Sequence, residues 1–185
     1  MNPTDVLKEE HAAIQQMLTI MERICSLIDE AKPVDPDDLE QVVDFIQTFA
    51  DKCHHGKEED LLFPAAEAAG IPRTGGPVGV MLREHVSGRE FVRNMKEAVT
   101  ACKAGDGEAA KLFSEHTRKY IALLRSHIAK EDNILYPMID QRLTAGKQQE
   151  LLEAFDRVEQ EVVGAGKHEA YHALLKRLAS EYVTS

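Results

Sequence analysis

The hydrophobic positions of the chain recur at helical spacing in six segments. Within each segment an apolar residue returns after three or four positions, which is the period of one face of an α-helix. Clusters of Pro and Gly interrupt this rhythm at AKPVDP, GIPRTGGP, AGDG, TAG and GAG. We therefore predict helices at residues 3–31, 36–69, 77–103, 107–143, 146–163 and 167–183.

The first four predicted helices are long and their connections are short. Short connections between long helices favour antiparallel neighbours. We predict an all-α fold in which residues 1–143 form an up-down-up-down four-helix bundle. The two shorter C-terminal helices, within residues 144–185, are expected to form an extension that packs on the bundle.

Strongly polar side chains interrupt the apolar stripes of the four long helices. A buried carboxylate is costly unless a partner or a metal ion compensates its charge. In a regular α-helix, His55 and Glu59 turn away from the stripe toward a flank or water. The polar residues that keep the register, and so are predicted to face inward, are His11, His54, Glu58, His85, His127 and Glu131.

These polar positions belong to an internal repeat. KEEH matches LREH, and His54-x-x-x-Glu58 matches His127-x-x-x-Glu131, with EEDLLFP facing EDNILYP. Residues at i and i+4 share one helical face, so a His and a Glu at that spacing can reach one ion. Two hairpins related by approximate two-fold symmetry would bring two such sets together. The pattern predicts a site for two metal ions, and its nitrogen and oxygen ligands suit iron or manganese, with zinc as a third choice.

Composition and charge narrow the function. The net charge of −10 argues against nucleic-acid and anionic-membrane partners, which require clustered Lys and Arg. No apolar run is long enough to span a membrane, and the first residues lack the pattern of a signal peptide. Cys25, Cys53 and Cys102 form no CxxC pair, which favours a reducing compartment. We expect a cytoplasmic protein.

The complete pattern resembles the hemerythrin HHE cation-binding family. H…HxxxE…H…HxxxE, with LFP or LYP after each HxxxE, is similar to that family over roughly residues 5–142. The resemblance implies a four-helix bundle around a non-haem di-iron centre with an oxo or hydroxo bridge. It implies His11, His54, His85 and His127 as terminal ligands and Glu58 and Glu131 as bridging ligands.

One position departs from the oxygen-carrying members of that family. Invertebrate hemerythrins have a fifth histidine one turn after the third, where this chain has Arg89. The set therefore resembles the bacterial four-His, two-Glu proteins, some of which are linked to iron–sulfur repair and nitric oxide stress. Neither reversible oxygen carriage nor cluster repair is expected here. We expect a protein that binds or reacts with oxygen, nitric oxide or peroxide, and the sequence does not decide whether it is an enzyme.

Two other functions remain open from the sequence. The C-terminal helices could transmit ligand or iron occupancy, which would make the protein a sensor or store, or their apolar seams could form a homodimer. A metal-free structural bundle is the plainest alternative.

Among neighbouring residues, Gly88 could leave a void for ligand access, Tyr120 and His116 continue the inward stripe, and Cys53 adjoins His54.

Overall fold

The computed structural model describes residues 1–164 and 166–183 and is helical throughout, without a strand in those ranges. Residue 165 and residues 184–185, part of the predicted C-terminal extension, lie outside the described residues. The all-α prediction is confirmed. The elements, including four π-helical segments labelled η, are α1 Pro3–Asp29, α2 Pro36–Phe45, η1 Ile46–His55, η2 Glu58–Leu62, α3 Phe63–Ala68, α4 Pro77–Lys103, α5 Ala109–Lys130, η3 Glu131–Leu135, α6 Tyr136–Arg142, α7 Ala145–Val158, η4 Glu159–Val163 and α8 Lys167–Tyr182.

The predicted helix starts rest on local chemistry that the structure contains. The Asp35 carboxylate accepts a hydrogen bond from the backbone N–H of Asp37, and Pro36 occupies the first turn, where its missing N–H is not needed. Pro3 opens α1 in the same way, and the backbone N–H of Asn2 donates to Asp5. Gly105 has a φ of 89° just after α4, the left-handed conformation that ends many helices.

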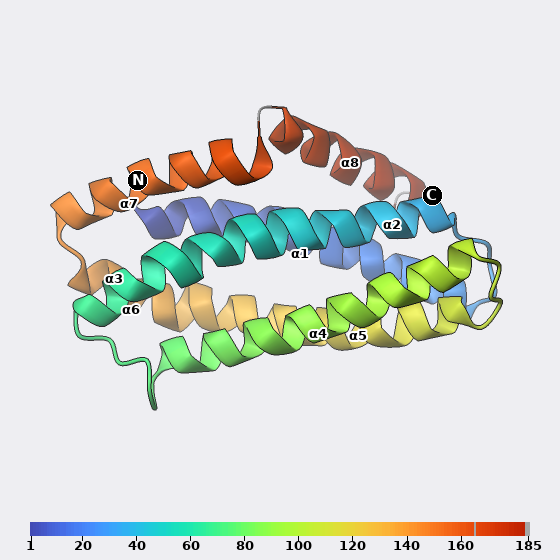
Figure 1. Ribbon diagram of the computed structural model, residues 1–185, viewed down its shortest axis with the longest axis horizontal. Helices are drawn as coiled ribbons and strands as arrows, with labels where there is room; N and C mark the ends of the chain where they lie inside the picture. The colour runs from blue at the N-terminus through green and yellow to red at the C-terminus, as the bar shows by residue number, and fades with distance from the viewer. Residues whose placement is uncertain (165, 184–185) are drawn as a thin grey trace.

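Four long helical stretches lie side by side along the longest axis (Figure 1). They are α1, the stretch from α2 to α3, α4, and the stretch from α5 to α6. The α4 helix packs on α5 and α2, and α5 also packs on α1. The α7 and α8 helices follow one another along one side of this group, and both contact α1.

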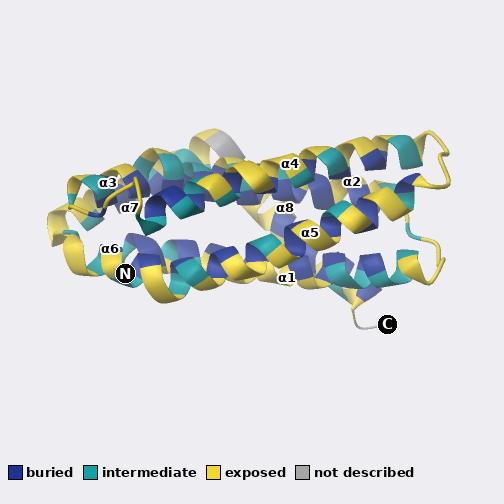
Figure 2. Ribbon diagram, turned by 90° about the horizontal axis from the view of Figure 1, so that it is seen from below, coloured by how far each residue is buried: buried dark blue, intermediate teal, exposed yellow. Residues whose placement is uncertain are grey.

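Buried residues lie on the inward faces of the long helices (Figure 2). They form two hydrophobic clusters at different heights. On α1, Leu7 belongs to one cluster and Ile14 to the other, and on α4 the same holds for Met81 and Val92. The polar residues at core positions therefore lie between two apolar layers that shield them from water.

The π-helical segments correct the predicted inward register. In η3 the Tyr136 N–H reaches back to the Glu131 carbonyl, five residues away, so the turn is wider than in an α-helix. The wider turn accommodates Pro137, which has no N–H and would clash with a carbonyl four residues earlier. Residues after Glu131 are therefore rotated: Leu135 and Tyr136 are buried. A regular α-helical period would instead place Ile134 and Met138 on the inward stripe, but Ile134 is 54% exposed and Met138 is also exposed.

The C-terminal helix is held to α2 by a buried carboxylate. Asp38 is 5% exposed and accepts hydrogen bonds from the Tyr182 hydroxyl at 2.5 Å and from Arg177 at 2.6 Å. Tyr171 of α8 donates to Asp44 at 3.0 Å, and its ring packs on Phe45. None of the helices in the described ranges has the length and apolarity needed to cross a membrane.

We predict that Tyr182→Phe lowers the free energy of unfolding by about 2 kcal/mol, because it removes a hydrogen bond to a buried charge. Urea denaturation of the purified protein measures this change. Tyr171→Phe is the matched control, since its partner Asp44 is exposed and can bind water instead. Equal losses from the two substitutions would contradict the importance of the Asp38 contact.

Candidate metal centre

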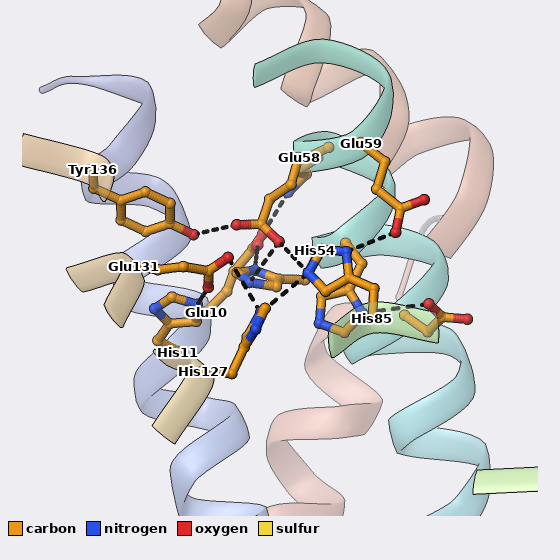
Figure 3. A network of polar contacts seen from close by, with 12 residues as sticks. Glu10, His11, His54, Glu58, Glu59, His85, His127, Glu131 and Tyr136 are labelled. Atoms are coloured by element: carbon orange, nitrogen blue, oxygen red, sulfur yellow. Dashed lines mark hydrogen bonds and ion pairs between the residues drawn. The ribbon is translucent and has the colours of Figure 1, made fainter. Parts of the chain in front are cut away.

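The structure brings the six predicted inward residues together in one network of polar contacts (Figure 3). Each is at most 1% exposed. They come from α1, η1, α4 and α5 and from the first residues of η2 and η3. The prediction that they converge therefore agrees with the geometry, while their role as metal ligands stays a prediction. The six are His11, His54, Glu58, His85, His127 and Glu131.

Their potential ligand atoms form two groups. One contains His55, Glu58, His85 and His127, and the other contains His11, His54 and Glu131. Within each group the nitrogen and oxygen atoms lie within 4.8 Å of one another. The Nε2 atoms of His85 and His127 are 3.1 Å apart. Two imidazole nitrogens bound to one ion at about 2.1 Å, roughly at right angles, would lie about 3 Å apart.

The two glutamates lie between the histidines of the two groups. One oxygen of Glu131 is 3.2 Å from His11 Nε2 and the other is 3.2 Å from His127 Nε2. The Oε2 atom of Glu58 is 3.4 Å from His85 Nε2 and 3.8 Å from His54 Nε2. Each carboxylate therefore faces one histidine from each half of the chain, Glu131 with both oxygens and Glu58 with Oε2.

The charge of Glu58 is stabilised by its surroundings. Burial would raise its pKa, but His54 and His85 outweigh burial and hold that pKa well below its usual value. Burial and the nearby carboxylates raise the pKa of Tyr136, so its hydroxyl stays protonated. That hydroxyl donates to Glu58 Oε1 at 2.6 Å. Glu58 is thus an oriented carboxylate whose second oxygen has no hydrogen bond.

In every predicted histidine ligand, the Nδ1–H group donates a hydrogen bond to a carboxylate. His11 Nδ1 bonds Asp132 at 2.8 Å, and His54 Nδ1 bonds Glu10 at 2.8 Å. These bonds fix the orientation of each ring, so that Nε2 points into the centre and can supply a lone pair to a cation once it is deprotonated. Without a cation, the nearby carboxylates outweigh burial and raise the pKa of His11 and of His85 to about 9. The other two pairs are His85 with Glu59 at 2.6 Å and His127 with Glu84 at 2.9 Å.

These carboxylates follow the internal repeat. The acid before the first histidine of each half, Glu10 or Glu84, orients the second histidine of the same half. The acid after each bridging position, Glu59 or Asp132, orients the first histidine of the other half. Glu59, which the α-helical period placed outside the inward stripe, is half-exposed but nevertheless orients a histidine of the centre. The repeat contained the signal: Glu-His recurs at 10–11 and 84–85, and Lys-Glu followed by an acid recurs in KEED and KEDN.

Each half of the repeat also contains a lysine that bonds one of these carboxylates. Lys57 has no exposed surface and donates to Glu10 at 2.5 Å and to Glu159 at 2.7 Å. Lys130, at the matching position of the repeat, donates to Glu84. Because Glu159 lies in η4, Lys57 connects the centre to the C-terminal extension, and among the described residues Lys130 has no such contact.

His55 is buried, which corrects the prediction that it faces a flank or water. It is 4% exposed, and its ring stacks on His85 with centroids 3.9 Å apart. The π-helical η1 ends at His55, and its wider turns rotate that residue inward beside His54. Burial lowers the pKa of His55 well below its usual value, so the ring is neutral. Its Nε2 atom has no hydrogen-bond partner.

The donor atoms of the centre fit a pair of cations. Buried atoms without a hydrogen bond include Nε2 of His11, His54 and His55, Oε2 of Glu58 and both carboxylate oxygens of Glu131. Native proteins leave few such atoms unsatisfied, and each needs an explanation. Atoms of one centre that lack protein partners and carry lone pairs or negative charge are the donor set that a cation requires. Without thiolates in the set, the donors favour iron or manganese over structural zinc.

The remaining candidates from the sequence have different environments. Gly88 and Tyr120 are buried and face one another. His116 is half-buried with a buried Nδ1 that has no hydrogen bond, away from both donor groups. Burial raises the pKa of Cys53 to about 11, so its thiol is protonated and a reactive thiolate is not supported.

Comparison with known proteins finds a family model that matches most of the chain, including both copies of the repeat. A family model described as the hemerythrin HHE cation-binding domain matches residues 2–139. Similar curated relatives are an uncharacterized protein of Mycobacterium bovis and two uncharacterized proteins of Mycobacterium tuberculosis. Each is 27% identical over 156 residues, which cover 83% of this chain and 59% of the relative. The chain thus spans less than two thirds of these relatives' length. No solved structure matches the chain.

We predict that Glu10→Gln weakens cation binding about 10- to 100-fold, because the carboxylate orients His54 and strengthens it as a ligand. Competition titration with a chromophoric chelator measures the affinity. Glu9→Gln is the control, because Glu9 is exposed and differs by one position only. An affinity equal to that of the Glu9 variant would show that the carboxylate of Glu10 does not support the ligand.

Proposed function

Because the chain belongs to the hemerythrin HHE cation-binding family, we propose that it holds two iron ions and binds or reacts with a small ligand such as oxygen, nitric oxide or peroxide. In this proposal the long helices form an up-down-up-down four-helix bundle around the ions. The ligands are His11, His54, Glu58, His85, His127 and Glu131, with the two glutamates as bridges.

One observation supports the proposal most strongly. Four imidazoles present Nε2 toward two buried carboxylates, while all four Nδ1 atoms are bonded to carboxylates. A network of hydrogen bonds alone would pair the inner atoms with one another, yet most of them have no hydrogen bond. A bound iron pair would supply electron transfer and positions for a small ligand. Six inward polar residues without such an ion would destabilise the core.

The chain's own residues define the environment for that chemistry. The two hydrophobic clusters exclude water on both sides, which strengthens electrostatic interactions in the centre. Tyr136 holds Glu58 by its hydroxyl and stacks on His11 with ring centroids 5.5 Å apart. In the other half the matching residue is Phe63, which has no hydroxyl and stacks on His85. The two sides of the centre therefore differ in polarity.

We predict two irons per chain in anaerobically purified protein, with near-ultraviolet charge-transfer absorption after exposure to air. Glu58→Ala should lose that absorption and at least half of the iron. The substitution removes one proposed bridging ligand, and the histidines alone hold the iron more weakly. Elemental analysis and an optical spectrum measure both quantities. Glu67→Ala is the control, since Glu67 lies in α3, farther along the same helical stretch, and pairs with Arg73 at the surface.

A wild-type chain that binds no stoichiometric metal would contradict the proposal and leave a metal-free bundle. Iron binding without any change on addition of oxygen, nitric oxide or peroxide would retain the centre and reject the small-ligand function. Rapid consumption of peroxide would identify an enzyme, a question that the sequence leaves open.

A sensor is a second candidate function, and Lys57 is the observation that favours it. The chain of contacts runs from His54 to Glu10, then to Lys57, and from there to Glu159 in the C-terminal extension. The ammonium group also lies 5.6 Å from the centroid of the Phe155 ring in α7. A change in charge at the centre would act on this buried lysine directly, because little water screens it.

We predict that iron loading slows amide hydrogen exchange in α7 and α8, and that Lys57→Met removes this effect. Lys130→Met is the matched control, because Lys130 occupies the same place in the repeat and its partner in the described part of the chain is Glu84 in α4. Hydrogen-exchange mass spectrometry with and without iron makes the comparison. Equal protection in the two variants would reject the connection through Lys57 without affecting the metal centre.

The cytoplasmic location, the division of the chain at residue 143 and a homodimer formed through the C-terminal seams stay predictions. The seams are partly used within the chain, since Leu151 and Phe155 pack in one hydrophobic cluster and Leu175 and Leu178 in the other.

A further inference from the structure

A cavity of about 360 Å³ extends from the surface to one of the two donor groups. Its walls come from η1, α4 and α5 and include His55, Gly88 and Tyr120. His55 also belongs to the donor group that contains Glu58, His85 and His127. The imidazole of His55 therefore separates the cavity from the centre, and the cavity leads to this group.

Gly88 creates part of this space. It lies one turn after His85 on α4, and a Cβ atom there would come within 3.6 Å of the Tyr120 ring and 3.8 Å of Leu123 and Leu124. A methyl group would thus just fit, while a larger side chain would fill the gap. Because Gly inside a helix costs up to about 1 kcal/mol relative to Ala, a packing or functional reason is expected.

The internal repeat shows that the opening is one-sided. The position that matches Gly88 in the first half is Ile14, and the position that matches His55 in the second half is Ile128. Both isoleucines are 1% exposed and belong to a hydrophobic cluster. On the side of His11 and His54 the equivalent places are therefore occupied by large apolar side chains.

The cavity has a positive mouth in a chain of net charge −10. Its lining has three cationic side chains, Arg89, Arg93 and Lys96, against the one carboxylate of Asp51. Arg89 is already paired with Asp51 at 2.8 Å and with Glu59 at 2.7 Å. Arg93 has only a 3.9 Å contact with the exposed Glu90, and Lys96 has no ion pair in the described ranges.

We propose that this cavity is the entrance through which a small anion reaches the donor group that contains His55, and that Arg93 and Lys96 attract the anion to it. The inference rests on the proposed iron centre and adds to it the route and the charge of the ligand. Clefts lined by one sign of charge raise the association rate of oppositely charged ligands. A neutral molecule such as nitric oxide uses the same space without that attraction.

The test compares an anion with a neutral ligand on iron-loaded protein. Stopped-flow absorbance gives the association rate of azide with the oxidised form and of nitric oxide with the reduced form. Arg93→Glu combined with Lys96→Glu should slow azide about tenfold at low ionic strength and leave nitric oxide unchanged. Added salt should reduce the difference for azide.

Matched variants separate local charge from net charge and from space. Lys147→Glu combined with Lys176→Glu changes the net charge equally on exposed residues away from the cavity and should leave azide binding near the wild-type rate. Gly88→Leu should slow azide and nitric oxide alike at unchanged iron content, and Gly88→Ala should slow both less. The charge variants keep the proposal testable if Gly88→Leu does not fold.

The outcomes distinguish this inference from the proposed function. Azide rates that are equal in the two double variants, with two irons bound, would overturn the anion entrance and leave the metal centre in place. Unchanged rates in a folded, iron-loaded Gly88→Leu variant would overturn the route. A wild-type chain that binds no iron would overturn both the centre and the entrance.

Discussion

The surroundings of the centre compensate the negative charge of two carboxylates that are buried among four imidazoles. Glu58 and Glu131 have no exposed surface, and a buried negative charge is stable only beside compensating groups. The imidazoles provide part of that compensation, and each imidazole is in turn fixed by an outer carboxylate. Lys57 and Lys130 then neutralise two of the outer carboxylates. Charge therefore alternates outward from the centre, and the apolar clusters above and below keep water away from it.

The internal repeat makes the centre nearly symmetric, and three positions break that symmetry. Tyr136 in one half corresponds to a phenylalanine in the other half, and His55 and Gly88 correspond to isoleucines. The symmetric positions orient the donors equally on both sides. The asymmetric positions give one side a hydroxyl and the other a cavity and an additional imidazole. The two sides of the centre therefore differ in polarity and in access from the surface, although they come from one repeat.

The sequence alone predicted most of the helices and the convergence of six residues. Helix starts depend on local chemistry, such as Pro36 after Asp35, and an apolar stripe depends on a period that can be read along the chain. The repeat added long-range information, because two matching hairpins can share one centre only if their inward faces meet. For these reasons His11, His54 and His85 could be placed inward without coordinates.

Residues whose orientation depends on π-helical turns could not be placed from the sequence. A regular α-helical period places His55 and Ile134 in the wrong environments because π-helical turns rotate the chain, and only the packed helices reveal where those turns lie. The partners of the histidines were likewise open, because Glu9 and Glu10 are adjacent and only the approach of another helix selects one of them. The sequence by itself determined the helical period, the repeat and the inward donors. The tertiary structure decided which carboxylate orients each imidazole and where a cavity reaches the centre, because those properties depend on distances between helices.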